Sequence, residues 1–368
     1  MGEFLPEMNS FSNPNAIHWL RWLFKKYDFL PGITFYFISQ RNATSPRFFP
    51  LLDQMRSVRI VFIRGSKFRK LDVFFLKFLK IFIYFNVSKI NRYHWFLAPI
   101  GLVNPNLRIN QVLNLDDPLY NEAEMATLLD WEDFLKSTNF EGKIVTTNVT
   151  TKQYLEDKGI ISSVHIVEQG YNGIEMGEIK KFETFSCVYS SPYIDAGNDK
   201  QSNHPTWGAT EFLKVIVPKI IEKDSNIDIH IIGRMGPDAK NLIKDYPQVK
   251  LHGLRSFREN NLIMAKCHLG IYPRKIDNGR RVQKIYEYMG VDLPIVSFLL
   301  EDTKSVIELD IGVCVTEEEQ FVEEIIEMKN NPGKLNYFLD QIAIQKGNYS
   351  WTFLAKKYDT LIYHDFII

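Results

Sequence analysis

A short predicted helix over residues 280–290 carries three cations and one carboxylate on a single face. These charged residues are Arg280, Arg281, Lys284 and Glu287. Their spacing places them within i,i+3 or i,i+4 reach of one another. Cations suit a diphosphate group, and a carboxylate can accept hydrogen bonds from the two vicinal hydroxyls of a ribose. A solvated helix face with an ordinary surface salt bridge would show the same residues, so the neighbouring sequence has to decide.

The flanking residues predict where this helix begins and ends. We expect it to begin near Asn278, Gly279 and Arg280, so that its free N–H groups lie beside the cations. Gly290 is expected to end it, and 294–298 reads as a short buried strand. Val282, Ile285, Tyr286 and Met289 form an apolar stripe that should face a core.

The whole chain alternates strand and helix patterns, which favours an α/β fold with parallel sheets. In the first half the expected strands are 33–39, 58–64, 94–100, 111–116, 143–147 and 164–168. In the second half they are 185–191, 227–233, 249–253, 268–273, 294–298 and 312–316. Long helices are expected at 16–27, 206–223 and 349–366, and a linker at 170–184. Two halves with the same rhythm predict two Rossmann-like domains with a ligand between them.

Composition excludes several functional classes. The 368 residues carry no net charge, so a global grip on nucleic acid is not expected. The three cysteines lie in apolar runs without CxxC spacing, which indicates reduced core residues. No His/Cys cluster has zinc spacing, and no Asp-x-Asp triplet is present, so we expect no metal site. The start of the chain lacks the pattern of a signal peptide, and we expect a cytoplasmic protein.

The order of motifs in the second half resembles the GT-B glycosyltransferases, in particular their group-1 family, also classed as family four. The similarity covers roughly residues 185–365. It is carried by Gly233, Gly236, Gly253, Pro273, Lys284, Glu287, Tyr288, Met289, Gly290, Pro294 and Val296, and by Ser350, Trp351, Ala355, Tyr358, Leu361 and Ile362 near the end.

This resemblance implies two Rossmann-like domains that face each other across a cleft, with a C-terminal helix that crosses back to the first domain. The N-terminal acceptor-binding domain would span 1–172 and the nucleotide-sugar-binding domain 173–348, followed by the helix 349–368. The implied activity is transfer of a sugar from a UDP- or GDP-linked donor to a hydroxyl acceptor. The acceptor would be a glycan or a lipid-linked sugar. Retention of configuration and independence of metal and cofactor are further expectations.

The family's donor site maps onto named positions of this chain. The expected binding residues are Gly233, Arg234, Gly253, Leu254, Asn278, Gly279, Arg280, Arg281, Lys284 and Glu287. Retaining members carry a second glutamate seven residues before the equivalent of Glu287, where this chain has Gly279, with Asp277 as the nearest acid. The phosphate-binding glycine and lysine after the first strand of the domain are also replaced, and either Lys200 or Arg234 could supply the charge.

Acidic residues of the first half are the remaining catalytic candidates. Asp116 and Asp117 close a predicted strand, at the edge where cleft residues lie in α/β folds. An ordinary turn and helix cap would look the same. His18 and His165 are isolated and read as structural or surface residues.

The stretch 67–85 interleaves five basic residues with Phe, Leu and Ile, and its apolar part is too short to span a bilayer. It predicts either a helix buried against a sheet or a peripheral contact with anionic lipid.

Two alternatives to a transferase remain at this stage. One is a nucleotide-sugar epimerase of the same two-domain shape. The other is a non-catalytic protein that binds a nucleotide sugar, which the glycine at position 279 makes conceivable.

Overall fold

The computed structural model describes part of the chain. In the first half it describes the backbone of β1 (Thr34–Ser39), β2 (Arg59–Arg64), β3 (Arg92–Phe96) and β4 (Asn110–Asn114). From residue 132 to 354 it describes the chain except 139, 141, 147–148, 161–162, 172–178, 195–210, 256, 276–281 and 351–352. The described residues up to Glu168 form one compact unit, here the first unit, and those within Gln169–Phe353 form the second unit.

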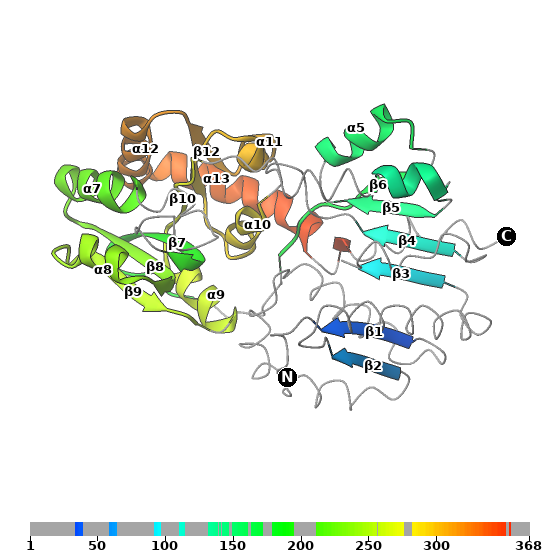
Figure 1. Cartoon of the computed structure of the whole chain (residues 1–368). Coiled ribbons are helices and arrows are strands. Elements are labelled where there is room, and N and C mark those ends of the chain that lie inside the picture. Colours follow the sequence, from blue (N-terminus) through cyan, green and yellow to red (C-terminus); the bar gives the residue numbers. More distant parts are fainter. Residues whose placement is uncertain are drawn as a thin grey trace. The chain divides into compact units, whose positions relative to one another are not determined.

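The strands of the first unit are all paired in parallel. β1 pairs with β2, and a separate sheet has the order β3-β4-β5-β6, with β5 at Lys143–Thr146 and β6 at Val164–Ile166. Helix α5 (Val149–Asp157) joins β5 to β6, as expected for a crossover between parallel strands. Ile144, Val145 and Leu155 are buried between these elements. Strands therefore lie at all six expected places in this half, and a helix is described between β5 and β6 (Figure 1).

The second unit is built on a six-stranded parallel sheet of order β12-β11-β10-β7-β8-β9. The strands are β7 (Phe185–Ile194), β8 (Ile227–Met235), β9 (Val249–Gly253), β10 (Leu269–Tyr272), β11 (Ile295–Phe298) and β12 (Gly312–Val315). The helices are α7 (Val217–Lys223), α8 (Pro237–Ile243), α9 (Phe257–Lys266), α10 (Gln283–Gly290), α11 (Lys304–Glu308), α12 (Glu318–Asn330) and α13 (Pro332–Gln345). Such a doubly wound sheet is the Rossmann-like architecture that the sequence predicted.

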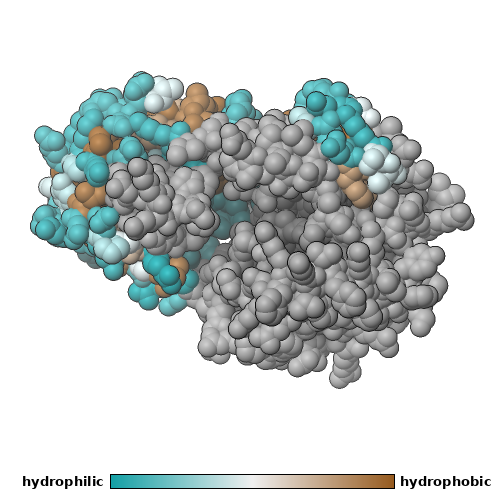
Figure 2. All heavy atoms as spheres, in the orientation of Figure 1, coloured by the Kyte–Doolittle hydropathy of each residue, from teal (hydrophilic) through white to brown (hydrophobic). Residues whose placement is uncertain are grey.

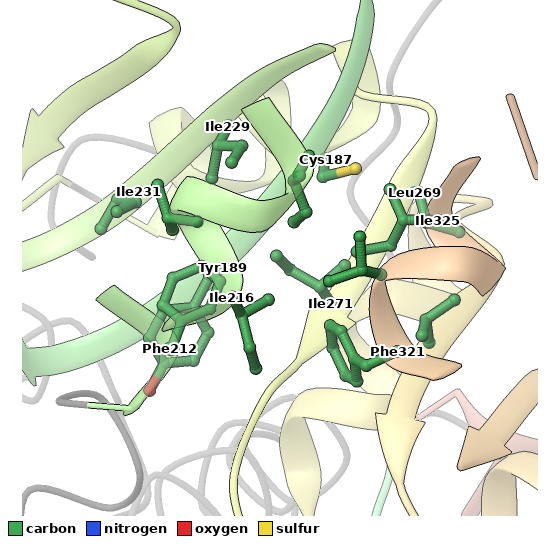
Figure 3. Packing of buried hydrophobic residues seen from close by; sticks show 14 of the residues in the cluster. Cys187, Tyr189, Phe212, Ile216, Ile229, Ile231, Leu269, Ile271, Phe321 and Ile325 are labelled. Carbon is green, nitrogen blue, oxygen red and sulfur yellow. The ribbon is translucent and has the colours of Figure 1, made fainter. Parts of the chain in front are cut away.

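Helices cover both faces of this sheet, and each face has its own apolar core. One core joins strand residues such as Cys187, Ile229 and Ile271 to Phe212 before α7 and Phe321 of α12 (Figure 3). The other core lies under α9, α10 and α11, and includes Val188, Ile285 and Met289. Because both faces are covered, strands β10 and β11 are buried along their whole length, as is usual in parallel sheets.

The chain enters and leaves the second unit at one place. The N–H of Tyr171, near its start, donates to the carbonyl of Tyr349 at 2.9 Å, and Tyr171 forms a parallel bridge with Ser350. The Tyr171 ring lies on Gly290 at the end of α10, where a Cβ atom would come within 2.4 Å of the ring. These contacts hold the two connecting segments together.

Several boundaries differ from the prediction. Strand β7 continues to Ile194, beyond the expected end at 191, because Tyr193 and Ile194 pair with Arg234 and Met235 after a register shift. Strand β3 is Arg92–Phe96, so the expected strand 94–100 is confirmed at its start alone.

Helix 206–223 is described from residue 211, and its Phe212–Ile216 turn is a π-helix before α7. Pro218 explains the wider turn, because it has no N–H to donate back to the preceding turn.

The apolar residues of the second unit are mostly internal. Cys187 and Cys267 are buried, Cys314 is half-buried, and none of these forms a disulfide, as predicted. The visible face of the unit is mainly hydrophilic, with separate apolar patches (Figure 2). Among the helices that the structure describes, none is long and apolar enough to cross a membrane. Residues 67–85 and the expected helix 16–27 lie outside the described part of the chain.

Candidate active site

The second unit has a topological switch point between β7 and β10. Strands β8 and β9 follow β7 towards one edge of the sheet, whereas β10, β11 and β12 follow it towards the opposite edge. In such sheets a crevice opens where the order reverses, outside the carboxyl ends of the strands, and ligands bind there. The residues at this edge therefore define the candidate site.

Lys284 and Glu287 of α10 meet at the switch point. Their side chains form a short ion pair, and 19% of Lys284 and 15% of Glu287 remain exposed. The Lys284 ammonium also donates to the hydroxyl oxygen of Ser190 on β7, with 3.4 Å between Nζ and Oγ. Helix α10 thus brings the predicted cation and carboxylate together, and β7 adds a hydroxyl that sequence reasoning missed.

The helix that holds this pair begins later than predicted. The expected start was near 278–280, but α10 begins at Gln283, and Val282 before it has an extended backbone with φ −81° and ψ 118°. A β-branched residue such as Val282 is easily accommodated in this extended conformation. Lys284 therefore lies in the first turn of α10, near its free N–H groups, and Glu287 lies one turn further along.

Two glycines shape the ends of the neighbouring strands. Gly233 in β8 has φ 144° and Gly253 at the end of β9 has φ 67°, and both conformations disfavour residues with a side chain. Arg234 and Leu254, the predicted binding residues that follow them, are exposed, with Leu254 57% accessible. The structure places all four at the ends of β8 and β9.

The end of β10 adds basic residues to the same edge. Arg274 is 9% exposed and its Nη1 donates to the Tyr272 hydroxyl at 3.1 Å. Lys275 pairs with Glu318 at the start of α12 at 2.7 Å, and its ammonium lies 5.0 Å from the centre of the Phe298 ring.

Burial keeps two tyrosine side chains near the site in their neutral form. Desolvation raises the pKa of both Tyr189 and Tyr288 above the usual range of a phenol, so both hydroxyls stay protonated. Neither tyrosine can act as a base near neutral pH.

Seven predicted site residues are not among those that the structure describes. They are Asp116, Asp117, Asp277, Asn278, Gly279, Arg280 and Arg281. Their roles stay predictions, as does the crossing of the helix 349–368. In the part of the chain that is described, no three His, Cys, Asp or Glu side chains gather to hold a metal ion.

Part of the second unit matches a known protein family. Residues 201–331 match the model of the family described as Glycosyl transferases group 1. HepE from Anabaena, solved with UDP and glucose, has a TM-score of 0.63 at 12% identity, with 95% of this chain and 96% of that chain covered. Sucrose-phosphate synthase from Thermosynechococcus elongatus also has a TM-score of 0.63 at 10% identity, with 96% and 94% covered. No curated protein matches the sequence.

TarM from S. aureus is similar over a smaller share. An S. aureus TarM mutant, solved with UDP and alpha-GlcNAc-glycerol among its ligands, has a TM-score of 0.54 at 12% identity. The alignment covers 70% of this chain and 52% of that one, so the chain spans about half the length of this relative.

These findings confirm the predicted fold and the resemblance of residues 201–331 to the group-1 glycosyltransferases. The chain has the GT-B fold, and its second unit carries the pattern of the group-1 glycosyltransferases.

Two residues of the site were not among the predicted ones. Ser190 lies 94 positions before Lys284, and nothing local in the sequence signals their contact. Arg274 carried a weak signal, because it follows Pro273 at the carboxyl end of a predicted strand, where ligand residues gather.

Proposed function

We propose that the chain transfers a sugar from a nucleotide diphosphate donor to a hydroxyl acceptor, without a metal ion and with retention of configuration. The observation that carries the proposal is the Lys284–Glu287 pair at the switch point, with Ser190 beside it. The family match over 201–331 supports it, and UDP in the complexes of HepE and TarM favours a UDP-linked donor over a GDP-linked one.

The chemistry of the pair suits such a donor. A lysine ammonium has three N–H donors, and two of them serve Glu287 and Ser190. The third can bind a phosphate oxygen. The Glu287 carboxylate has room for several hydrogen bonds and can accept those of two ribose hydroxyls while it keeps Lys284. Lys284 and the free N–H groups of α10 would then bind the diphosphate of the nucleotide, and Glu287 would bind its ribose.

In the proposed reaction the bond between the sugar's anomeric carbon and the diphosphate oxygen breaks. A bond from the acceptor oxygen to the same carbon forms, and the acceptor hydroxyl passes its proton to the departing diphosphate. Negative charge grows on the departing diphosphate, and Lys284 in the first turn of α10 stabilises it. Arg280 and Arg281, as predicted from the sequence, would add further positive charge that stabilises the departing diphosphate.

The acceptor is proposed to be a glycan or lipid-linked sugar. Among the similar structures, WaaG is a glycosyltransferase involved in lipopolysaccharide biosynthesis, with a TM-score of 0.59 at 10% identity. A lipid-linked acceptor would agree with a peripheral contact through 67–85 of a cytoplasmic protein. Asp116 and Asp117 are proposed to face this acceptor.

The test compares binding and turnover in matched variants. Isothermal titration with UDP and with GDP, followed by turnover of UDP-sugars with acceptor sugars, is done on the wild type and on Lys284→Ala/Glu287→Ala. The matched control is Glu301→Ala/Lys304→Ala, which removes another i,i+3 pair of the second unit that lies on its surface. We expect the first variant alone to lose nucleotide affinity. Equal affinity in both variants refutes the site.

The same experiment separates the alternative of a non-catalytic binding protein, which the glycine at position 279 favours. Binding of UDP without turnover of any donor would support that alternative and contradict a transferase.

A further inference from the structure

The hydroxyl of Tyr288 lies between β7 and β10, where the two strands separate. The register joins Cys187 to Leu269 and Val188 to Gly270. Continued by two residues, it would place Ser190 opposite Tyr272, and the next rung would run from the Ser190 N–H to the Ile271 carbonyl.

The tyrosine hydroxyl replaces that rung. The Ser190 N–H donates to the Tyr288 oxygen at 3.1 Å, and the Tyr288 hydroxyl donates to the Ile271 carbonyl at 3.2 Å. One direct backbone hydrogen bond is thus exchanged for two that pass through a side chain. The strands are held apart by the width of one hydroxyl group, and neither buried backbone group is left unpaired.

Packing fixes the ring that delivers this hydroxyl. The Tyr288 side chain is fully buried, and its ring lies directly against the backbone of Gly270. A Cβ atom on Gly270 would come within 2.7 Å of the ring carbons Cγ and Cδ2, closer than real Cβ contacts allow. The glycine on β10 and the two hydrogen bonds therefore define one position for the ring.

The position of Ser190 matters because its hydroxyl contacts Lys284. Ser190 is 5% exposed and its Oγ accepts from the Lys284 ammonium at 3.4 Å. Tyr288 follows Glu287 directly in α10, so one turn of helix holds both the ion pair and the residue that sets the strand spacing. The main chain of Ser190 is bound to the same helix that carries Lys284 and Glu287.

We propose that Tyr288 is a positioning residue, which sets the width of the crevice at the switch point and, through Ser190, the place of Lys284. The inference rests on the proposed binding of a nucleotide diphosphate at this pair. It predicts that the phenolic hydroxyl affects nucleotide affinity although it is buried away from the ligand.

The test is Tyr288→Phe, which keeps the ring and removes the hydroxyl. The affinity for UDP is measured by isothermal titration, with thermal unfolding recorded for each variant. We expect Kd to rise roughly tenfold, about the effect of one hydrogen bond to a charged group. The control is Tyr286→Phe, a buried tyrosine of the same helix whose ring contacts Tyr349 instead, and it should keep the wild-type Kd.

A double-mutant cycle separates positioning from stability. In a Lys284→Ala background, Tyr288→Phe should change Kd less than about twofold, because its effect is transmitted through Lys284. Gly270→Ala, which keeps the hydroxyl but displaces the ring, should weaken UDP binding as Tyr288→Phe does. If Tyr288→Phe does not fold, Ser190→Ala and Gly270→Ala carry the test.

The outcomes are distinguishable. A lower melting temperature with unchanged Kd in Tyr288→Phe, or an equal loss in the Lys284→Ala background, overturns the inference and leaves the proposed function intact. An unchanged Kd for UDP in both Ser190→Ala and Gly270→Ala likewise overturns the inference and leaves the proposed function intact. A wild-type protein that binds neither UDP nor GDP refutes the proposed function, and this inference with it.

Discussion

Acid should destabilise the second unit, because His230 of β8 is buried as a neutral imidazole. Its side chain is 4% exposed, stacks on Phe182 with ring centres 4.5 Å apart, and shares a 2.9 Å hydrogen bond with His252. Burial, followed by the neighbouring His252 and Lys250, lowers the pKa of His230 from 6.5 to about 4. The neutral form is thus favoured in the folded protein and the charged form in the unfolded chain.

The sign and size of the effect follow from proton linkage. A lowered folded-state pKa gives stability that is complete above pH 6.5 and is lost as the pH falls towards 4. Since one pKa unit corresponds to about 1.4 kcal/mol, this histidine should remove about 2 kcal/mol by pH 5 and about 3 kcal/mol by pH 4. The pKa of His252 is lowered as well, chiefly by burial, so protonation of His252 also destabilises the folded protein as the pH falls.

The assay is urea unfolding at a series of pH values between 7.5 and about 4, followed by circular dichroism. The variant His230→Phe keeps an aromatic ring against Phe182 and removes the titrating group. The wild type should lose about 2 kcal/mol more than the variant between pH 7 and pH 5. Parallel pH dependence of the two proteins would refute the assignment of a buried neutral His230.

Four further outcomes are expected. Phe321→Ala, at a fully buried core position of α12, should lower the free energy of unfolding by about 3–5 kcal/mol, as measured in urea; a loss below about 1 kcal/mol would contradict the packing. Sugar transfer should survive EDTA, and loss of activity restored by manganese would contradict metal independence. Residues 67–85 should bind anionic liposomes more than neutral ones in sedimentation. Equal binding would favour the alternative that the segment is a helix buried against a sheet. Trp351→Ala should lower the melting temperature and reduce turnover more than nucleotide binding, and a variant that melts normally with full activity would refute the predicted helix crossing.

Local patterns in the sequence were sufficient for the parts of the site that lie on one element. Lys284 and Glu287 are three residues apart on one helix, so their contact follows from helical spacing, and the structure confirms it. Gly290 was predicted to end this helix, and it does. Strands such as β10, β11 and β12 were also predictable, because each is a short apolar run bounded by polar or turn residues.

Long-range contacts set the features that the sequence could not predict. The extension of β7 to Ile194 depends on pairing with Met235, more than 40 residues later. Tyr288 was known from the motif, but its hydroxyl's two partners lie on β7 and β10, and their arrangement depends on how these strands diverge. The later start of α10 reflects the extended conformation of Val282, which helical periodicity alone does not reveal.

The pairing of Tyr171 with Tyr349 and Ser350 has a consequence for the modularity of the chain. The segments that lead into and out of the second unit are paired with each other, so the two ends of this unit lie at adjacent points. Segments whose ends meet in this way can be cut out, transplanted or reconnected with little change at the junction. Residues 169–353 therefore define a cassette, and under the proposed function an exchange of donor preference would be engineered at these two adjoining positions.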